Sequence, residues 1–299
     1  MKNNLHIYIR ALRLPFLTAS VLPFILGTLI AKDDLLWLRF LMGLVSVVFT
    51  HIGANLMNDY ADSKSGADWQ DTHFFGFFGG SKLIQEGVLS QKFYLQLSLF
   101  SFFIAFSAVI GLCFAMGTLA VLGYYFLILF LGFSYSHKPL QLLYHRLGEL
   151  IIFMLFGPAL VMGAYYIQTG IFPGLKPFFL SLPAGFFTTA ILFANEVPDF
   201  FDDIKSGKNT LISIIGPEKS YIFYFILEIT GLAFILINLA RGYLSWISAG
   251  ALGLLFIVIK ATFILKKEYL NKEKLVASSK LTIHIQTAAC IIMIAGILL

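Results

Sequence analysis

The sequence predicts an all-α fold, a polytopic membrane bundle of about nine transmembrane helices. Of its 299 residues, 59% are hydrophobic and only 12% are charged, which is about half the charged share of soluble domains. Its 32 Phe residues would leave a soluble globule of this size with a largely apolar surface. The composition also excludes a disordered chain and a disulfide-framed secreted domain, because Cys113 and Cys290 each lie inside an apolar run.

Apolar runs bounded by polar clusters divide the chain into spans, each near the ~20 residues that cross a bilayer. The first run, Pro15 to Ala31, looks like a secretion signal, but it lacks a convincing small-residue cleavage site and further runs follow. We therefore interpret it as a retained span of a single membrane-embedded domain over 1–299. In chain order, the predicted spans are 14–31, 37–57, 92–113, 117–135, 148–168, 177–195, 220–240, 243–265 and 283–299.

The basic residues set the orientation of these spans through the positive-inside rule. With nine spans, the even-numbered connections share the side of the N-terminus, and that side holds sixteen Lys and Arg residues against four on the other. Basic residues that merely solubilise loops would show no such bias. We therefore expect an integral membrane protein whose N-terminus and long connections are cytoplasmic and whose C-terminus is outside.

The acidic residues gather in two short windows, which hold eight of the 16 Asp and Glu residues. The windows are Asp59, Asp62, Asp68 and Asp71, and then Glu196, Asp199, Asp202 and Asp203. They close the second and sixth spans, so both lie at the predicted cytoplasmic face. Four spans separate them, which suggests two tandem four-helix units plus one extra helix.

Each window contains one helical pattern, provided that its span continues through it. Side chains spaced i, i+4, i+7 share one face of a helix. This spacing occurs at Asn55, Asp59 and Asp62, and again at Asn195, Asp199 and Asp202. Glu196 and Asp203 lie beside the second face, where Pro198 would open or kink the helix.

Carboxylates packed this closely repel one another and resist ionising together unless cations are present. Magnesium takes oxygen ligands and is usually bound by one or two carboxylates plus substrate phosphates, so two facing clusters suit magnesium around a diphosphate. Two solvated acidic loops are the alternative, but two matched faces in a chain with so few acidic residues favour a binding site.

Four nearby lysines are candidates for phosphate contacts, although each could equally be a lysine that binds lipid headgroups or follows the positive-inside rule. They are Lys82, Lys138, Lys205 and Lys208.

Five elements spread over nearly the whole chain add a family pattern. They are Arg13-Leu-Pro15, Asn58-Asp59-x-x-Asp62, Gly80-Ser81-Lys82 with Gly87-Val-Leu-Ser90, Tyr135…Pro139…Leu147-Gly148-Glu149-Leu150, and Asp199-x-x-Asp202-Asp203 leading into Gly207-Lys208-Asn209-Thr210-Leu211. Together they resemble the UbiA superfamily of intramembrane aromatic prenyltransferases. The chain departs from the family's Asn-Asp-x-x-Asp-x-x-x-Asp at Gly66, which takes the third acidic position, while Asp68 lies two residues later.

The resemblance implies magnesium-dependent transfer of a prenyl group from a polyprenyl diphosphate to an aromatic acceptor. It implies metal contacts from Asn55, Asp59, Asp62, Asp199, Asp202 and Asp203, of which Asp59, Asp62, Asp199 and Asp203 would be catalytic. The implied substrate-binding residues are Asn55, Asn58, Lys82, Tyr135, Lys138, Asn195, Lys205 and Lys208. The apolar bundle would exclude water from the carbocation, a ring near Tyr135 would attack it, and Asp199 or Asp203 would take the ring proton.

Three segments are most similar to the 1,4-dihydroxy-2-naphthoate polyprenyltransferase branch of menaquinone biosynthesis. They are Asp62…Ser65-Gly66-Ala67-Asp68, Gln85-Glu86-Gly87 and Gly207-Lys208-Asn209-Thr210. 4-Hydroxybenzoate polyprenyltransferase is the nearest rival, ahead of haem-farnesylating and glycerol-phosphate geranylgeranylating relatives. The family favours a prokaryotic plasma membrane, and no nucleic-acid partner is predicted.

Two other classes compete with prenyl transfer. A secondary transporter predicts ionisable residues deep within its spans; Lys260 and Glu228 are the main candidates here, whereas the acidic windows lie at one membrane face. An intramembrane alcohol phosphotransferase also uses magnesium and clustered Asp residues, but its Asp-Gly…Ala-Arg signature is not found in the sequence. Prenyl transfer is therefore the favoured hypothesis.

Overall fold

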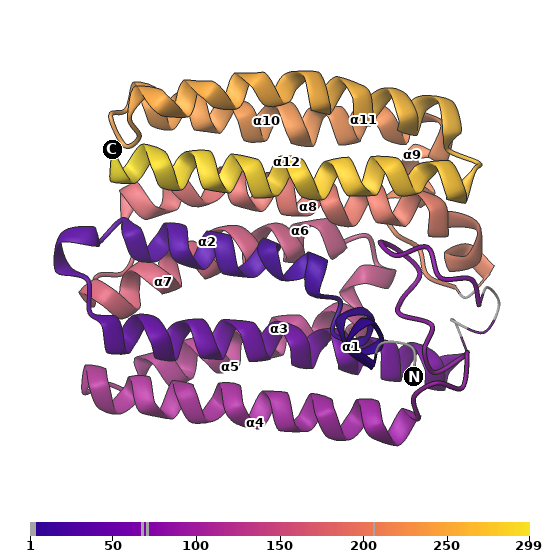
Figure 1. The fold of residues 1–299 in the computed structure, drawn as a ribbon, viewed down its shortest axis with the longest axis horizontal. Helices are drawn as coiled ribbons and strands as arrows, with labels where there is room; N and C mark the ends of the chain where they lie inside the picture. The colour runs from indigo at the N-terminus through magenta and orange to yellow at the C-terminus, as the bar shows by residue number, and fades with distance from the viewer. Residues whose placement is uncertain (1–3, 67–68, 70–71, 206) are drawn as a thin grey trace.

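Long helices lie side by side, with the connecting loops gathered at the two ends of the bundle (Figure 1). The structure is a computed structural model that describes residues 4–66, 69, 72–205 and 207–299. Asp68 and Asp71 of the first acidic window lie outside these ranges. The α-helices are α1 (Asn4–Ala11), α2 (Thr18–Leu29), α3 (Trp37–Ser65), α4 (Gln91–Met116), α5 (Ala120–Ser136), α6 (Gly148–Met154), α7 (Leu160–Thr169), α8 (Leu175–Lys205), α9 (Ile212–Ile215), α10 (Ser220–Ala240), α11 (Leu255–Glu268) and α12 (Lys272–Leu298).

The predicted polytopic helical bundle is confirmed. Within the described residues, seven helices are long and apolar enough to cross a membrane, and two further apolar helices, Leu14–Leu29 and Ala120–Ser136, are shorter. Every predicted span coincides with a helical segment. Because two of these segments are shorter than a full membrane crossing, the count of nine spans stays a prediction. The tandem arrangement of two four-helix units also stays a prediction.

Three helices extend further than the apolar runs predict. Helix α3 continues past Asp59 and Asp62 to Ser65, α8 continues through the whole second window, and Pro198 lies inside α8 without ending it. The predicted last span begins at 283, whereas α12 begins at Lys272, where the Asn271 side chain caps the helix by accepting the Lys274 N–H at 3.2 Å. Charged and polar residues in the first turns of α12 conceal the helix from a search for apolar runs.

The core of the bundle lies around α8, because 78% of its most apolar window is buried. This helix packs against α10, α12 and the π-helical turn η5 (Leu155–Ala159), which joins α6 to α7. Gly157 of this turn faces Gly185 of α8 so closely that an added Cβ would lie 2.8 Å from the Gly185 Cα. A π turn shifts the facing of the residues around it, and it brings Phe156 to the interior cavity described below.

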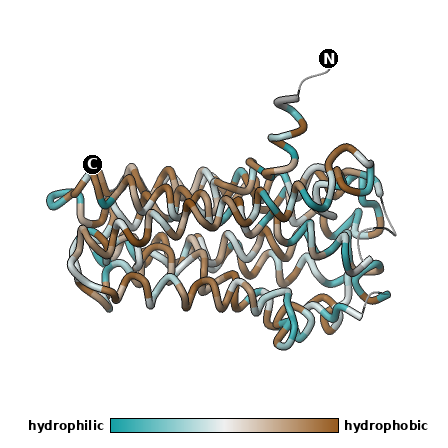
Figure 2. Tube along the Cα trace, turned by 90° about the horizontal axis from the view of Figure 1, so that it is seen from below, coloured by the Kyte–Doolittle hydropathy of each residue, from teal (hydrophilic) through white to brown (hydrophobic). Residues whose placement is uncertain are grey.

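The two ends of the bundle differ in polarity. Figure 2 shows hydrophobic residues along most of each helix and hydrophilic ones gathered toward the end away from the C-terminus. We call this the acidic end, because the last turns of α3 and α8, which contain Asp62 and Asp203, lie there. At the opposite end, Arg39 donates hydrogen bonds to the carbonyls of Ile167 and Gln168 in α7 and of Ala115 in α4, groups that have no partner within their own helices.

Candidate active site

A cavity of about 950 Å³ opens among α3, α5, α8 and η5 and has its polar lining at the acidic end. Along α3 it runs from Asp62 to Ser46, a depth of about 24 Å at about 1.5 Å per residue. Its inner part is lined largely by apolar side chains, among them Val47, Phe102 and Leu129. The cavity is therefore suited to a ligand with a charged head and a long apolar tail.

Most of the predicted site residues meet at this cavity, although they come from distant parts of the chain. The predicted residues in its lining are Asn55, Asn58, Asp62, Lys82, Tyr135, Asn195, Asp199, Asp202, Asp203 and Lys208. Three other predicted residues, Asp59, Lys138 and Lys205, are described in the structure but are not part of the lining. Described residues of both acidic windows thus line one cavity.

The first window presents a different face from the one predicted. Asn55, Asn58 and Asp62 line the cavity, a spacing of i, i+3, i+7 that also occupies one side of a helix. The Asn58 side chain donates a hydrogen bond to Asp62 Oδ2 at 3.0 Å, so this amide and this carboxylate are already held together at the cavity wall.

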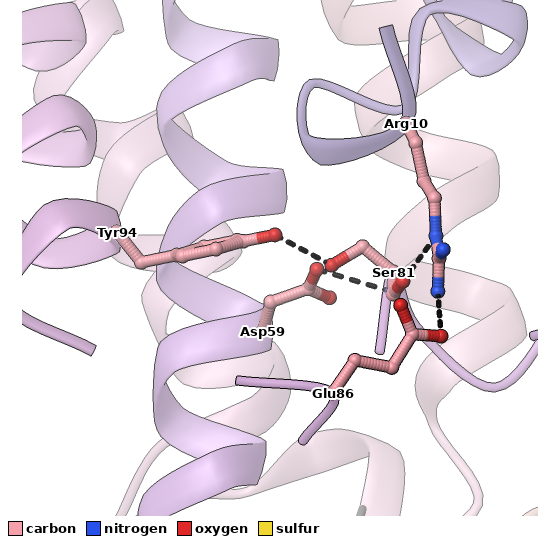
Figure 3. Close-up of polar contacts among 5 residues, drawn as sticks. All are labelled: Arg10, Asp59, Ser81, Glu86 and Tyr94. Carbon is pink, nitrogen blue, oxygen red and sulfur yellow. Dashed lines mark hydrogen bonds and ion pairs between the residues drawn. The ribbon is translucent and has the colours of Figure 1, made fainter. Parts of the chain in front are cut away.

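Asp59 is buried, with only 3% of its surface exposed, and is not part of the cavity lining. Its Oδ1 lies 2.7 Å from Arg13 Nη2. Its Oδ2 accepts the backbone N–H of Ser81 at 3.2 Å, as Figure 3 shows. Asp59 therefore ties the start of the chain and the α3–α4 loop to α3. In this structure its carboxylate neutralises an arginine, whereas the sequence predicts that it binds a metal ion.

The Ser81 loop is held from three further directions (Figure 3). The Ser81 hydroxyl is hydrogen-bonded to the Tyr94 hydroxyl at 2.7 Å, and the Ser81 carbonyl accepts from Arg10 Nε at 2.7 Å. Arg10 also forms an ion pair of 2.6 Å with Glu86. The next residue, Lys82, has the left-handed backbone conformation (φ 58°) and is 4% exposed in the cavity wall. The network thus fixes a buried lysine in the polar part of the cavity.

The second window combines carboxylates with two lysines. Lys272 Nζ lies 2.7 Å from Asp202 Oδ2, and Lys208 Nζ lies 3.0 Å from Asp203 Oδ2. Lys272 lines the cavity from the first turn of α12, a position that the sequence places 70 residues from its partner and that no motif marks. Asp199 lines the cavity too, and among the described residues no hydrogen bond or ion pair engages its carboxylate.

Lys208 is held in its charged form by its neighbours. Burial would lower its pKa, but Asp203 and Glu196 outweigh burial and raise the pKa above its ordinary value. The loop that carries Lys208 is also joined to the α5–α6 loop by a backbone bridge between Asn209 and His145. Lys208 therefore keeps its positive charge at the cavity mouth, where it is suited to bind the oxygens of a diphosphate.

The donor set of the two windows fits magnesium. Its members present carboxylate or amide oxygens, the ligands that this ion prefers. The Asn195 Oδ1 atom is buried and accepts no hydrogen bond from the described residues, so it is an oxygen that a cation or its bound water would satisfy. Within the described part of the chain, no three His, Cys, Asp or Glu side chains already form a metal-binding group.

The chain matches a protein-family model and several known proteins. The model of the UbiA prenyltransferase family matches residues 20–284. A 1,4-dihydroxy-2-naphthoate octaprenyltransferase from Bacillus subtilis is 32% identical over 205 residues, which cover 67% of this chain and 63% of that protein. UbiA prenyltransferase domain-containing protein 1 from Gallus gallus is 30% identical over 226 residues, which cover 74% and 65%. The matched region thus spans slightly less than two thirds of these relatives.

Two solved structures have the same fold. The apo structure of a UbiA homolog from Aeropyrum pernix K1 aligns with a TM-score of 0.70 at 16% identity, covering 94% of this chain and 96% of that one. A UbiA homolog from Archaeoglobus fulgidus bound to GPP and Mg²⁺ aligns with a TM-score of 0.60 at 17% identity, covering 97% and 99%. At these identities the likeness concerns the fold alone.

Proposed function

The chain belongs to the UbiA prenyltransferase family, and from this premise we propose that it transfers a prenyl group from a polyprenyl diphosphate to an aromatic acceptor. One observation supports this most directly: the Asn/Asp faces of α3 and α8 and two lysines, Lys82 and Lys208, line the polar part of a cavity whose interior is apolar. The carboxylates, amides and lysines match a metal-bound diphosphate, and the apolar interior matches an isoprenoid chain.

The proposed acceptor is 1,4-dihydroxy-2-naphthoate, and 4-hydroxybenzoate is the alternative. The name of the Bacillus subtilis relative supports the naphthoate, as do the segments around Asp62, Glu86 and Lys208. The positive-inside bias supports a cytoplasmic acidic end and N-terminus. The family also supports a plasma membrane as the location.

Magnesium, when bound, would act as a Lewis acid that neutralises the leaving diphosphate. Asn55, Asn58 and Asp62 would hold it from α3, and the acidic face of α8 from the other side. Lys82 and Lys208 bind diphosphate oxygens and stabilise the charge that develops as the allylic C–O bond breaks. The apolar wall excludes water from the allylic cation. Asp199 and Asp203 remain the predicted acceptors of the ring proton, and Asp59 positions Arg13 and the Ser81 loop.

An assay of the purified full chain in nanodiscs tests this function. Farnesyl diphosphate is supplied with 1,4-dihydroxy-2-naphthoate, with 4-hydroxybenzoate or with no acceptor, and the products are weighed by mass spectrometry. We expect a prenylated naphthoate that disappears with a chelator and returns with added magnesium. If no acceptor gives a prenylated product with farnesyl diphosphate, or with longer prenyl diphosphates supplied in the same way, the proposed function is wrong.

The two lysines that follow the second window provide a matched pair of variants. Lys208 is 21% exposed and lines the cavity, whereas Lys205 is 65% exposed and lies outside the lining. We expect Lys208→Met to lower the rate of diphosphate release by about 100-fold, the scale of losing one charge-stabilising group, and Lys205→Met to leave it nearly unchanged. Because the pKa of Lys208 is raised, its effect should not vary with pH in the neutral range. Equal rates for the two variants would remove Lys208 from the site.

A further inference from the structure

A histidine extends the polar face of α3 deeper into the cavity. His51, Asn55, Asn58 and Asp62 all line the cavity, and their spacing of i, i+4, i+7, i+11 forms one stripe along the helix. His51 lies one turn, about 6 Å, beyond Asn55 at about 1.5 Å per residue. It therefore lies next to the diphosphate-binding residues, on the side toward the apolar interior.

The imidazole of His51 is fixed in place by two neighbours. Its Nδ1 is hydrogen-bonded to the hydroxyl of Ser20 from α2, and Ser20 is only 4% exposed. The ring also meets the ring of Phe156 edge to face, with centroids 5.9 Å apart and planes at 83°. Since the Ser20 bond uses Nδ1, Nε2 is the ring nitrogen that serves a ligand in the cavity.

The position of His51 matches the place where the acceptor must bind. With the diphosphate at the Asn/Asp faces, the first carbons of the prenyl chain lie within one or two helical turns of Asn55. The attacking aromatic ring must approach those carbons, and its hydroxyl needs a partner that can also accept a proton. The lining beside His51 offers hydroxyls, such as Thr50 and Thr188, but these are far weaker bases than an imidazole. A histidine oriented by a second group is an arrangement typical of a general base.

We propose that His51, oriented by Ser20, binds the ring hydroxyl of a phenolic acceptor and takes its proton during attack on the prenyl group. This inference rests on the proposed function and adds a residue to it. The bond that forms joins an unsubstituted ring carbon to the allylic carbon, and the bond that breaks is the allylic C–O bond, whose electron pair leaves with the diphosphate. The hydroxyl proton moves to Nε2, which carries the lone pair because the imidazole's own proton is on Nδ1 and is donated to Ser20 Oγ. The ring carbon then loses its own proton to Asp199 or Asp203, and the oxygen regains a proton from His51 as the aromatic ring is restored.

The test measures acceptor and donor kinetics separately for His51→Phe, His51→Gln and Ser20→Ala. We expect His51→Phe to raise the KM for the acceptor and to lower kcat by about 100- to 1000-fold, with the KM for the prenyl diphosphate unchanged. His51→Gln should restore the acceptor KM but not kcat, because an amide binds a hydroxyl without accepting its proton. Ser20→Ala should lower kcat less than His51→Phe does. The matched control is His284→Phe, the same change at an exposed histidine of α12 outside the cavity lining.

A second measurement separates this role from a structural one. The O-methyl ether of the best acceptor lacks the hydroxyl proton, so wild-type protein should discriminate strongly against it, whereas His51→Phe and His51→Gln should treat ether and phenol nearly alike. Wild-type kinetics in His51→Phe, or undiminished discrimination in either variant, would overturn the proposal. If His51→Phe does not fold, the discrimination by His51→Gln decides the question. Failure of the proposed function would be distinguishable from failure of the His51 proposal, because wild-type protein would then prenylate no acceptor.

Discussion

Replacing Asp199 with Asn lowers the rate of prenyl transfer by about 100- to 1000-fold, the largest loss of activity that we expect from a single isosteric change. Asp199 lines the cavity from α8, and no ion pair or hydrogen bond from the described residues engages its carboxylate. We therefore expect its charge to act on the bound ligand. A preorganised charged group has its largest effect on the transition state when it faces the reacting atoms. The Asn side chain keeps the shape and removes only the charge.

The measurement is diphosphate release under saturating donor and acceptor, alongside thermal unfolding of each variant. Asp34→Asn is the control, because Asp34 is exposed at the opposite end of the bundle, next to the start of α3.

Two carboxylates of α3 should differ in the same measurements. We expect Asp62→Asn to lower the rate of prenyl transfer as Asp199→Asn does. Asp59→Asn should instead lower the unfolding midpoint, since it removes the partner of Arg13. Full turnover by Asp199→Asn in magnesium-containing buffer would exclude this carboxylate from catalysis.

The helices of the bundle were predictable wherever apolar composition alone determines them. Each apolar run coincides with a helical segment, because a bilayer-length run without charges has few other stable structures. Helix ends outside the apolar region were not predictable in this way. The first turns of α12, from Lys272 onward, contain Lys and Glu, and only Asn271 as a cap marks the true start.

The site was predictable as a set of residues but not as a set of contacts. The sequence pattern predicts the α3 triplet with Asp59, whereas the triplet that lines the cavity contains Asn58 in its place. Tertiary contacts make the difference, because Arg13 and Ser81 engage both oxygens of the Asp59 carboxylate. Lys272 was missed for a related reason: it reaches Asp202 only because α12 lies beside α8.

Gly27→Ala should be the most destabilising single-methyl change that the bundle allows. Gly27 lies in α2 where this helix crosses α7, and an added Cβ would collide with the backbone carbonyl of Val161 and lie 2.8 Å from the Ala164 Cβ. Backbone atoms cannot move aside as a flexible side chain can, so the two helices must separate. Small residues at such crossings are what permits close helix packing in membranes. Overpacking of this kind costs about 3 kcal/mol or more of the free energy of unfolding.

The matched control is Gly123→Ala in α5, where an added Cβ would meet nothing within 4 Å. Both changes add one methyl group to a glycine inside an apolar helix, so any difference between them reports packing and not helix propensity. We expect a markedly lower unfolding midpoint and poor recovery from detergent for Gly27→Ala, and wild-type behaviour for Gly123→Ala. Because α2 also supplies Ser20 to the cavity, separation of α2 from α7 should reduce prenyl transfer even in protein that remains folded. Equal stability of the two variants would contradict the close contact between α2 and α7.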